Sequence, residues 1–184
     1  MEKKPYQLGV LVGRFQTIHS GHEEMINKAI CLCEKVGIFV GSSQESGTNK
    51  NPFSYETRKE MLETIFNDQI SVYPLPDLGV GNNSVWGDYV LENVEKQFGR
   101  LPDLFVSGKE SRRIDWFDSV EGLSIAELYI PKTIDISATE MREFFLKDDF
   151  DGWRKYTNKS LWSKYEELKE EVVGSKDNMT TKSI

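Results

Sequence analysis

Residues 10–22 read Val10-Leu11-Val12-Gly13-Arg14-Phe15-Gln16-Thr17-Ile18-His19-Ser20-Gly21-His22. An apolar run typical of a buried strand ends at a Gly-Arg turn, and a His-x-Gly-His element follows it before an amphipathic helical pattern. This order places two imidazoles, an arginine and backbone N–H groups around one helix N-terminus. Such a terminus attracts anions, so the stretch predicts a site for a phosphate chain.

The residues of this turn suit that task individually. Ser20 and Glu23 fit a capping box, so we expect the helix to begin at or just after Ser20. Gly21 has no side chain and lets a phosphate or a purine approach the backbone closely. His19 and His22 can donate hydrogen bonds to phosphate oxygens, and Arg14 can supply a positive fork. Half of a zinc site is the alternative reading, but the chain contains only these two histidines.

A second element of the same kind follows later, Ile136-Ser137-Ala138-Thr139-Glu140-Met141-Arg142. Ser137 and Glu140 again fit a capping box, and Thr139 and Arg142 share one helix face. Taken alone, Ser-x-x-Glu is only a good helix start. Paired with the first turn, it predicts a second wall against a polyphosphate, and the two elements together indicate a nucleotidyltransferase.

Apolar runs alternate with helical patterns through most of the chain, which favours an α/β fold with a parallel sheet and helices on both faces. Ligands in such sheets bind at the carboxyl ends of the strands, beside a topological switch point, and both special turns follow strands. The expected strands are Gln7–Val12, Gly37–Gly41, Ile70–Pro74, Leu104–Ser107 and Ala126–Ile130, and the expected helices are Glu23–Lys35, Tyr55–Phe66, Val85–Phe98 and Ala138–Lys147.

The C-terminal part has a different pattern. Residues 151–173 predict one or two further helices packed on the domain, with Trp153, Trp162 and Leu168 among the apolar positions. Residues 174–184 are polar and lack periodicity, so we expect a disordered tail. The economical organisation is a single domain over residues 1–173 with a helical appendage from about residue 150.

Composition excludes several classes of function. The chain has 184 residues and a net charge of −7, which argues against a nucleic-acid partner because phosphate backbones need a basic face. No apolar stretch approaches the roughly 20 residues that span a bilayer, and no signal-peptide pattern begins the chain, so we expect a cytoplasmic protein without a membrane partner. Cys31 and Cys33 are expected to be reduced thiols, one of them facing the core.

The two turns resemble the two signatures of the nucleotidylyltransferase superfamily. The matching residues are Gly13-Arg14-Phe15-Gln16-x-x-His19-x-Gly21-His22 and Ile136-Ser137-x-Thr139-x-x-Arg142. Within the superfamily, the chain is most similar to nicotinamide-mononucleotide adenylyltransferases of the archaeal type and to the adenylyltransferase domain of the bifunctional Nudix proteins. Supporting segments are Lys50–Arg58, Pro74–Asp77 and Asn83–Trp86. No Nudix box is present.

This resemblance implies a Rossmann-like domain that joins ATP and nicotinamide mononucleotide into NAD and pyrophosphate, with Mg²⁺ held mainly by the ATP phosphates rather than by a protein metal site. His19, His22, Arg14 and Arg142 would act in catalysis. Trp86 would stack on the nicotinamide ring, although a tryptophan at a helix start is more often a core residue. Asn83 and Lys50 would contact that substrate, and relatives form homo-oligomers. The implied ATP site comprises Gly13, Arg14, Phe15, His19, Gly21, His22, Gly108, Ser137, Thr139 and Arg142.

Three departures from the family pattern stand out. Thr17-Ile18 replaces a proline-aromatic pair, Ala138 replaces a frequent serine or glycine, and Glu56-Thr57-Arg58 splits a Glu-Arg pair. None of them removes a group with an expected catalytic role. Two alternatives stay open: a nucleotidyltransferase for another phosphorylated acceptor (phosphopantetheine, a flavin or a polyol phosphate), and a sensor that binds NAD or ATP without turnover.

Overall fold

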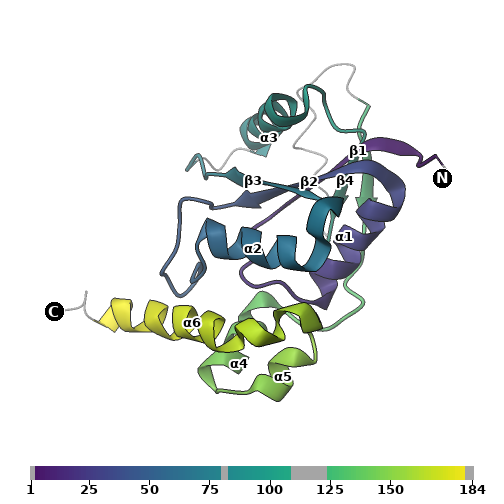
Figure 1. Ribbon diagram of the computed structural model, residues 1–184. Coiled ribbons are helices and arrows are strands. Elements are labelled where there is room, and N and C mark those ends of the chain that lie inside the picture. The colour runs from purple at the N-terminus through teal and green to yellow at the C-terminus, as the bar shows by residue number, and fades with distance from the viewer. Residues whose placement is uncertain (1–2, 80–82, 109–123, 181–184) are drawn as a thin grey trace.

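A five-stranded parallel sheet lies at the centre of the computed structural model, which describes residues 3–79, 83–108 and 124–180 (Figure 1). Its strand order is β3-β2-β1-β4-β5. The chain leaves β1 toward one edge of the sheet and returns to its other side at β4, so the topological switch point lies between β1 and β4. The elements are β1 (Tyr6–Gly13), α1 (Ser20–Leu32), β2 (Cys33–Gly41), α2 (Tyr55–Phe66), η1 (Asn67–Gln69), β3 (Ser71–Leu75), α3 (Asn83–Phe98), β4 (Leu104–Ser107), β5 (Ala126–Tyr129), α4 (Ala138–Leu146), α5 (Phe150–Arg154), η3 (Lys159–Lys164) and α6 (Tyr165–Thr180).

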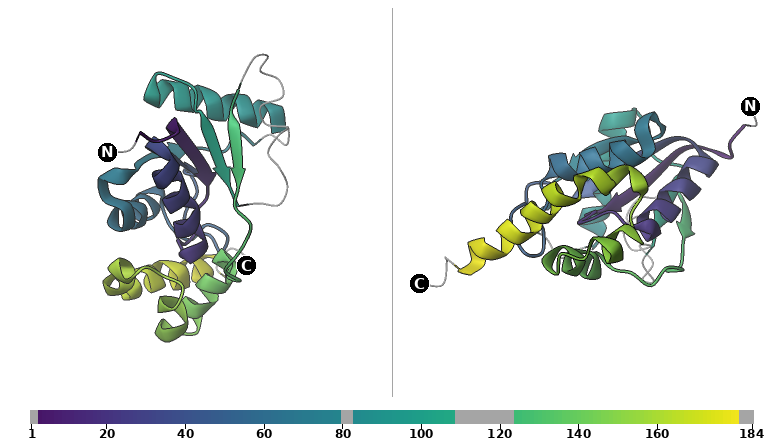
Figure 2. Two further views of the ribbon diagram at one scale, coloured as in Figure 1. Left: turned by 90° about the vertical axis from the view of Figure 1, so that its right-hand side faces the viewer. Right: turned by 60° about the horizontal axis from the view of Figure 1, so that its bottom comes forward.

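Helices cover both faces of the sheet, as the sequence predicts. Helix α3 lies on one face, and α1 and α2 lie on the other, with α4, α5 and α6 beyond them (Figures 1 and 2). Successive strand residues point to opposite faces. Val10 accordingly belongs to the core cluster that includes Val90 of α3, whereas Leu11 belongs to the larger cluster that includes Ile26 of α1.

The second strand begins earlier than the sequence predicts. Cys33 opens β2, where the helical pattern extends through Lys35, because β1 and β2 pair over their full length from Tyr6↔Cys33 onward. The Nζ atom of Lys4 donates to the carbonyls of Ile30 and Cys33 and caps the end of α1. Both cysteines are free, Cys31 exposed and Cys33 buried, which confirms that one thiol faces the core.

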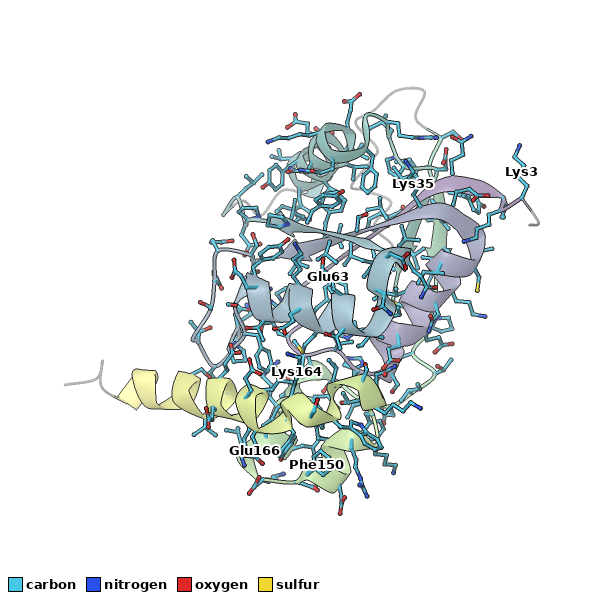
Figure 3. The ribbon with its side chains drawn as sticks, viewed as in Figure 1. Lys3, Lys35, Glu63, Phe150, Lys164 and Glu166 are labelled. Carbon is cyan, nitrogen blue, oxygen red and sulfur yellow. The ribbon has the colours of Figure 1, made fainter. Side chains whose placement is uncertain are left out.

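The C-terminal helices pack on one another through an aromatic cluster and are linked to α2 by a salt bridge. Trp153 is fully buried, and its ring centroid lies 5.2 Å from that of Tyr165. The ring of Phe150 meets the same tyrosine edge-on at 4.9 Å. Lys164 lies between α2 and these helices (Figure 3), where its ammonium pairs with the carboxylate of Glu60.

The expectation of a disordered tail from Gly174 was wrong for residues 174–180, which continue α6 to Thr180. Ser175 is buried and its hydroxyl donates to the carbonyl of Val172, so the polar composition here serves a helix end rather than a solvated coil. Residues 181–184 lie outside the described part of the chain. Across the described segments, no helix combines the length and apolar character needed to cross a membrane.

Candidate functional site

The turn after β1 buries the ring of Phe15. Phe15 has a left-handed backbone conformation (φ 51°), and its ring is only 3% exposed. A Cβ on Gly13 would lie 3.1 Å from that ring, so glycine permits the close packing. The ring centroid of Phe15 is 5.1 Å from that of His22. The turn thus provides a fixed apolar support for the second histidine.

The two histidines stack on each other at the start of α1. Their ring centroids are 3.9 Å apart with an interplanar angle of 33°. The carbonyl of His19 accepts hydrogen bonds from the backbone N–H groups of His22 (2.8 Å) and Glu23 (3.1 Å), which fixes the turn. A Cβ at Gly21 would lie 3.2 Å from the His19 ring. The glycine therefore makes room for the imidazole pair.

The predicted capping box at Ser20 and Glu23 was wrong. The N-cap residue is His19, and no side chain caps the helix. Ser20 is instead the first helical residue, and its backbone N–H donates to the carbonyl of Tyr156 at 2.8 Å. The carboxylate of Glu23 accepts from the side-chain amide of Asn158 at 2.8 Å, so the C-terminal part of the chain takes over both groups of the expected box.

Both imidazoles are neutral at pH 7. Burial, helped by the positive charge of Lys132, lowers the pKa of His19 from 6.5 to about 4. Burial, with the neighbouring His19, also lowers the pKa of His22 well below its ordinary value. The Nδ1 atoms of both rings are buried with no hydrogen-bond partner in the described part of the protein. Unpaired buried polar atoms are rare, which marks this histidine pair as unusual among the described residues.

The second turn forms as the sequence predicts. Ser137 is the N-cap residue of α4, and its hydroxyl accepts from the backbone N–H of Glu140 (3.2 Å) and donates to the carboxylate of Glu140 (2.6 Å). Thr139 and Arg142 lie on one face, where Nη2 of the arginine donates to the threonine hydroxyl at 3.3 Å. The hydroxyl of Ser137 is therefore engaged by the helix itself.

Arg142 joins the two turns directly. Its Nη1 donates to the backbone carbonyl of Gln16 at 2.7 Å, across 126 residues of sequence. Burial and the nearby positive charge of Arg14 lower the pKa of Arg142. The side chain of Arg14 is exposed, and its Nη1 donates to the side-chain carbonyl of Asn51 at 3.5 Å. Both arginines line the same cavity, and two cations there favour a bound polyanion.

A cavity of about 600 Å³ opens where these elements meet, at the carboxyl ends of β1 and β4. A Cβ at Gly108 would lie 2.5 Å from the sulfur of Met25, so this wall also depends on a glycine. Trp86 reaches the cavity from the first turn of α3. The residues of the sequence prediction that line the cavity are Gly13, Arg14, Phe15, His19, Gly21, His22, Trp86, Gly108, Ser137, Thr139 and Arg142.

Two predicted residues are not part of this lining. Lys50 lies in an adjoining groove that shares Thr139 and Arg142 with the cavity. Asn83 begins α3, and its side chain lies outside the described residues, as do residues 80–82 of the polar run before Trp86.

Sequence reasoning missed Lys132, which lines the cavity from the loop after β5 and pairs with Asp135 at 2.7 Å. Its position just beyond a parallel strand was the signal that could have found it, because ligands bind at such strand ends. Glu24 and Asp77 add carboxylates to the rim. Among the described residues, no three His, Cys, Asp or Glu side chains come together to hold a metal ion.

Two helix starts flank the switch point of this parallel sheet, and each has an arginine at the cavity, Arg14 before α1 and Arg142 in α4. This arrangement defines a nucleotide-binding α/β protein of the Rossmann type. Comparison with known families narrows this class. The chain belongs to the cytidylyltransferase-like family, whose model matches residues 10–144.

Known relatives share a common description. The chain is 32% identical over 167 residues to a nicotinamide-nucleotide adenylyltransferase from Thermococcus sibiricus, covering 88% of this chain and 84% of that protein. It is 39% identical over 93 residues to the enzyme of the same name from Pyrococcus abyssi, covering 48% of this chain and 49% of the relative. The chain thus spans about half the length of the latter relative and of several similar ones.

A solved structure has the same fold. It is a bifunctional NMN adenylyltransferase/ADP ribose pyrophosphatase from Francisella tularensis, in complex with AMP and a manganese ion. The TM-score is 0.71 at 25% identity, and the match covers 96% of this chain and 54% of that one. The Rossmann-like nucleotidyltransferase fold with a helical C-terminal part, expected from the sequence, is confirmed.

Proposed function

We propose that this protein transfers the adenylyl group of ATP to nicotinamide mononucleotide, forming NAD and pyrophosphate. The observation that carries the proposal is the convergence of both phosphate turns and Trp86 on one cavity of about 600 Å³. Cavities of this size suit small-molecule and cofactor ligands. The full-length similarity to the Thermococcus sibiricus enzyme supports the choice of reaction.

ATP would lie across the switch point. Its adenosine would lie toward Gly108 and the loop after β5, and its phosphates between the histidine pair and α4. Arg14 and Arg142 would supply fixed positive charge, with Lys132 as a third cation at the rim. His19 and His22 would contribute hydrogen bonds as neutral imidazoles, because burial lowers the pKa of each.

The chemistry needs no general base from the protein. The nucleophile would be the phosphate of nicotinamide mononucleotide, whose second pKa is about 6, so it is largely dianionic at neutral pH. One of its oxygens would bond to the α-phosphorus of ATP while the bond to the bridging oxygen breaks in line and pyrophosphate leaves. The protein must then position two like-charged reactants and stabilise the charge that builds on the leaving group. The four cationic or hydrogen-bonding residues His19, His22, Arg14 and Arg142 suit this task.

Trp86 would select the acceptor. Its half-buried ring borders the cavity from α3, where it can stack on the flat cationic nicotinamide ring. Asn83, at the start of the same helix, and Lys50, in the adjoining groove, would contact this nucleotide and its phosphate.

Mg²⁺ belongs to the proposal as a companion of the nucleotide. The described residues offer no set of three ligands for it, so the phosphates would hold the ion, which would neutralise part of their charge when bound. The manganese ion bound with AMP in the Francisella tularensis protein supports the use of a divalent cation. A cytoplasmic location and a homo-oligomeric state, both expected from the sequence resemblance, also remain proposals.

The test is to mix the purified protein with ATP, Mg²⁺ and either nicotinamide mononucleotide or its acid analogue, and to follow products by mass spectrometry. NAD and pyrophosphate in equal amounts would establish the activity, and the ratio of the two dinucleotides would fix the acceptor preference. ATP binding without any product would contradict the proposal. A panel of other phosphorylated acceptors, including phosphopantetheine and flavin mononucleotide, would then separate another transferase from a nucleotide sensor.

A further inference from the structure

Arg58 is a fully buried arginine, with 0% of its surface exposed, in the first turns of α2. Among the described residues, its guanidinium donates to four backbone carbonyls and to no carboxylate. Nη1 donates to Arg14 and Gly41 (both 2.9 Å), Nη2 to Ser42 (3.1 Å) and Nε to Ser54 (3.0 Å). One side chain therefore links the turn after β1, the turn after β2 and the N-cap of α2.

Three of these four carbonyls belong to residues that line the nucleotide cavity, namely Arg14, Gly41 and Ser42. Arg58 thus holds the backbone carbonyl of Arg14, while the guanidinium of Arg14 donates to Asn51. Asn51 is itself 2% exposed and donates to the carboxylate of Glu45. Arg14 thus brings an exposed charge to the cavity, and its backbone carbonyl and its guanidinium are both hydrogen-bonded to buried side chains.

The charge of Arg58 has no ion-pair partner among the described residues, in which every salt bridge involves other side chains. Burial and the nearby charge of Arg14 lower its pKa to about 10, opposed by Glu56, and the group remains protonated at pH 7. A buried cation is costly unless its hydrogen bonds are satisfied. The fork shape of guanidinium satisfies them here, and a lysine ammonium with three donors could not reach all four carbonyls.

We propose that Arg58 is a positioning residue, which holds the backbone of Arg14 so that the guanidinium of Arg14 lies where it receives the phosphates of the nucleotide. This inference rests on the proposed function for the identity of the ligand. A purely structural role of Arg58 would affect the binding of all ligands alike. The proposed role instead predicts an effect that depends on the phosphates of the ligand and that is transmitted through Arg14.

The experiment is a double-mutant cycle on ligand binding, measured by calorimetry with ATP and with adenosine. We expect Arg58→Lys to weaken ATP binding at least about tenfold, since displacement of a positioned charge is costly, and to change adenosine binding less than about twofold. In an Arg14→Ala background, Arg58→Lys should change ATP binding less than about twofold, because the residue through which it acts is gone.

Lys59→Arg, a neighbouring change on the same helix at a half-exposed position that pairs with Glu63, is the matched control and should leave both affinities unchanged. Arg58→Gln provides a second variant with the same expected pattern should the lysine variant fail to fold. Equal losses for ATP and adenosine, or a full loss in the Arg14→Ala background, would overturn the proposal.

Binding needs no acceptor, so the outcomes separate from those for the proposed function. A wild-type protein that binds ATP but makes no NAD would remove the proposed reaction and leave the role of Arg58 to be decided by the cycle. A wild-type protein that does not bind ATP would remove both proposals.

Discussion

In the proposed reaction, His22 would donate a hydrogen bond from a neutral imidazole that packs between His19 and Phe15. We expect His22→Ala to lower kcat by a factor of about 10² to 10³, the usual effect of removing one donor that stabilises developing charge. The control is Asn27→Ala, on the exposed side of the same helix. Steady-state NAD formation, with circular dichroism to show an intact fold, measures the effect. Turnover within a factor of three of wild type would remove His22 from the catalytic set.

In the proposed reaction, Trp86 would contact the other substrate, nicotinamide mononucleotide. Loss of stacking on a cationic ring corresponds to roughly 1 kcal/mol, so Trp86→Ala should raise KM for nicotinamide mononucleotide about fivefold to tenfold while KM for ATP stays constant. Val85→Ala, which shortens the exposed neighbour of the tryptophan, should leave both constants unchanged. A variant that raises both KM values equally would place Trp86 among packing residues instead.

The start of helix α4 depends on a single hydroxyl. Ser137 accepts from the backbone N–H of Glu140, and removal of such a cap costs about 1 kcal/mol. Ser137→Ala should therefore lower the free energy of unfolding by about that amount in urea titrations. Ser137→Asn, which keeps a capping oxygen, should stay within a few tenths of a kcal/mol of wild type. An alanine variant as stable as wild type would show that contacts of α4 with the body, not the cap, hold this turn.

Elements with strong periodicity were predictable, and those decided by distant partners were not. The bounds of α2 and β4 match their sequence patterns because their apolar positions and flanking turns are unambiguous. The residues around Cys33 follow a helical pattern, yet pairing with Tyr6 draws them into β2. Likewise, the backbone N–H of Ser20 donates to the carbonyl of Tyr156 and not to the side chain of a local capping box. Tyr156 lies 136 residues further along the chain, and no local pattern could indicate it.

At the scale of the whole molecule, the buried histidine pair makes stability depend on pH. The pKa of His19 is about 4 in the folded protein against 6.5 when unfolded, so the unfolded chain binds the proton more readily. Its contribution is fully present above pH 6.5 and is lost as the pH falls toward 4. Linkage gives a loss of roughly 2 to 3 kcal/mol by pH 4.5.

Urea unfolding at pH 7 and pH 4.5 measures this effect as a difference between wild type and His19→Asn, because the carboxylates titrate alike in both. We expect the wild type to lose more stability than the variant between the two pH values. Parallel losses would mean that folding does not change the pKa of His19.

The parts of the candidate site that belong to the two sequence motifs were predictable. Both turns follow strands, and a parallel sheet brings strand ends together, so their meeting follows from topology. Lys132 and Arg58 were missed for different reasons. Lys132 lies in a loop with no periodic pattern. Arg58 lies in a polar, exposed-looking stretch of helix sequence, and its place on one helix face with Met61 and Leu62 was the signal that could have found it.

The bond from the backbone N–H of Ser20 to the carbonyl of Tyr156 has a consequence for dividing this chain into fragments. The helix start that carries both histidines has one of its first donors satisfied from beyond residue 150, and Asn158 holds Glu23 in the same place. A fragment cut at the end of α4, or a permuted chain that frees the last helices, would retain every motif of the site. It would nevertheless lose both of these contacts to the histidine turn, so we expect the functional unit to extend through the C-terminal helices.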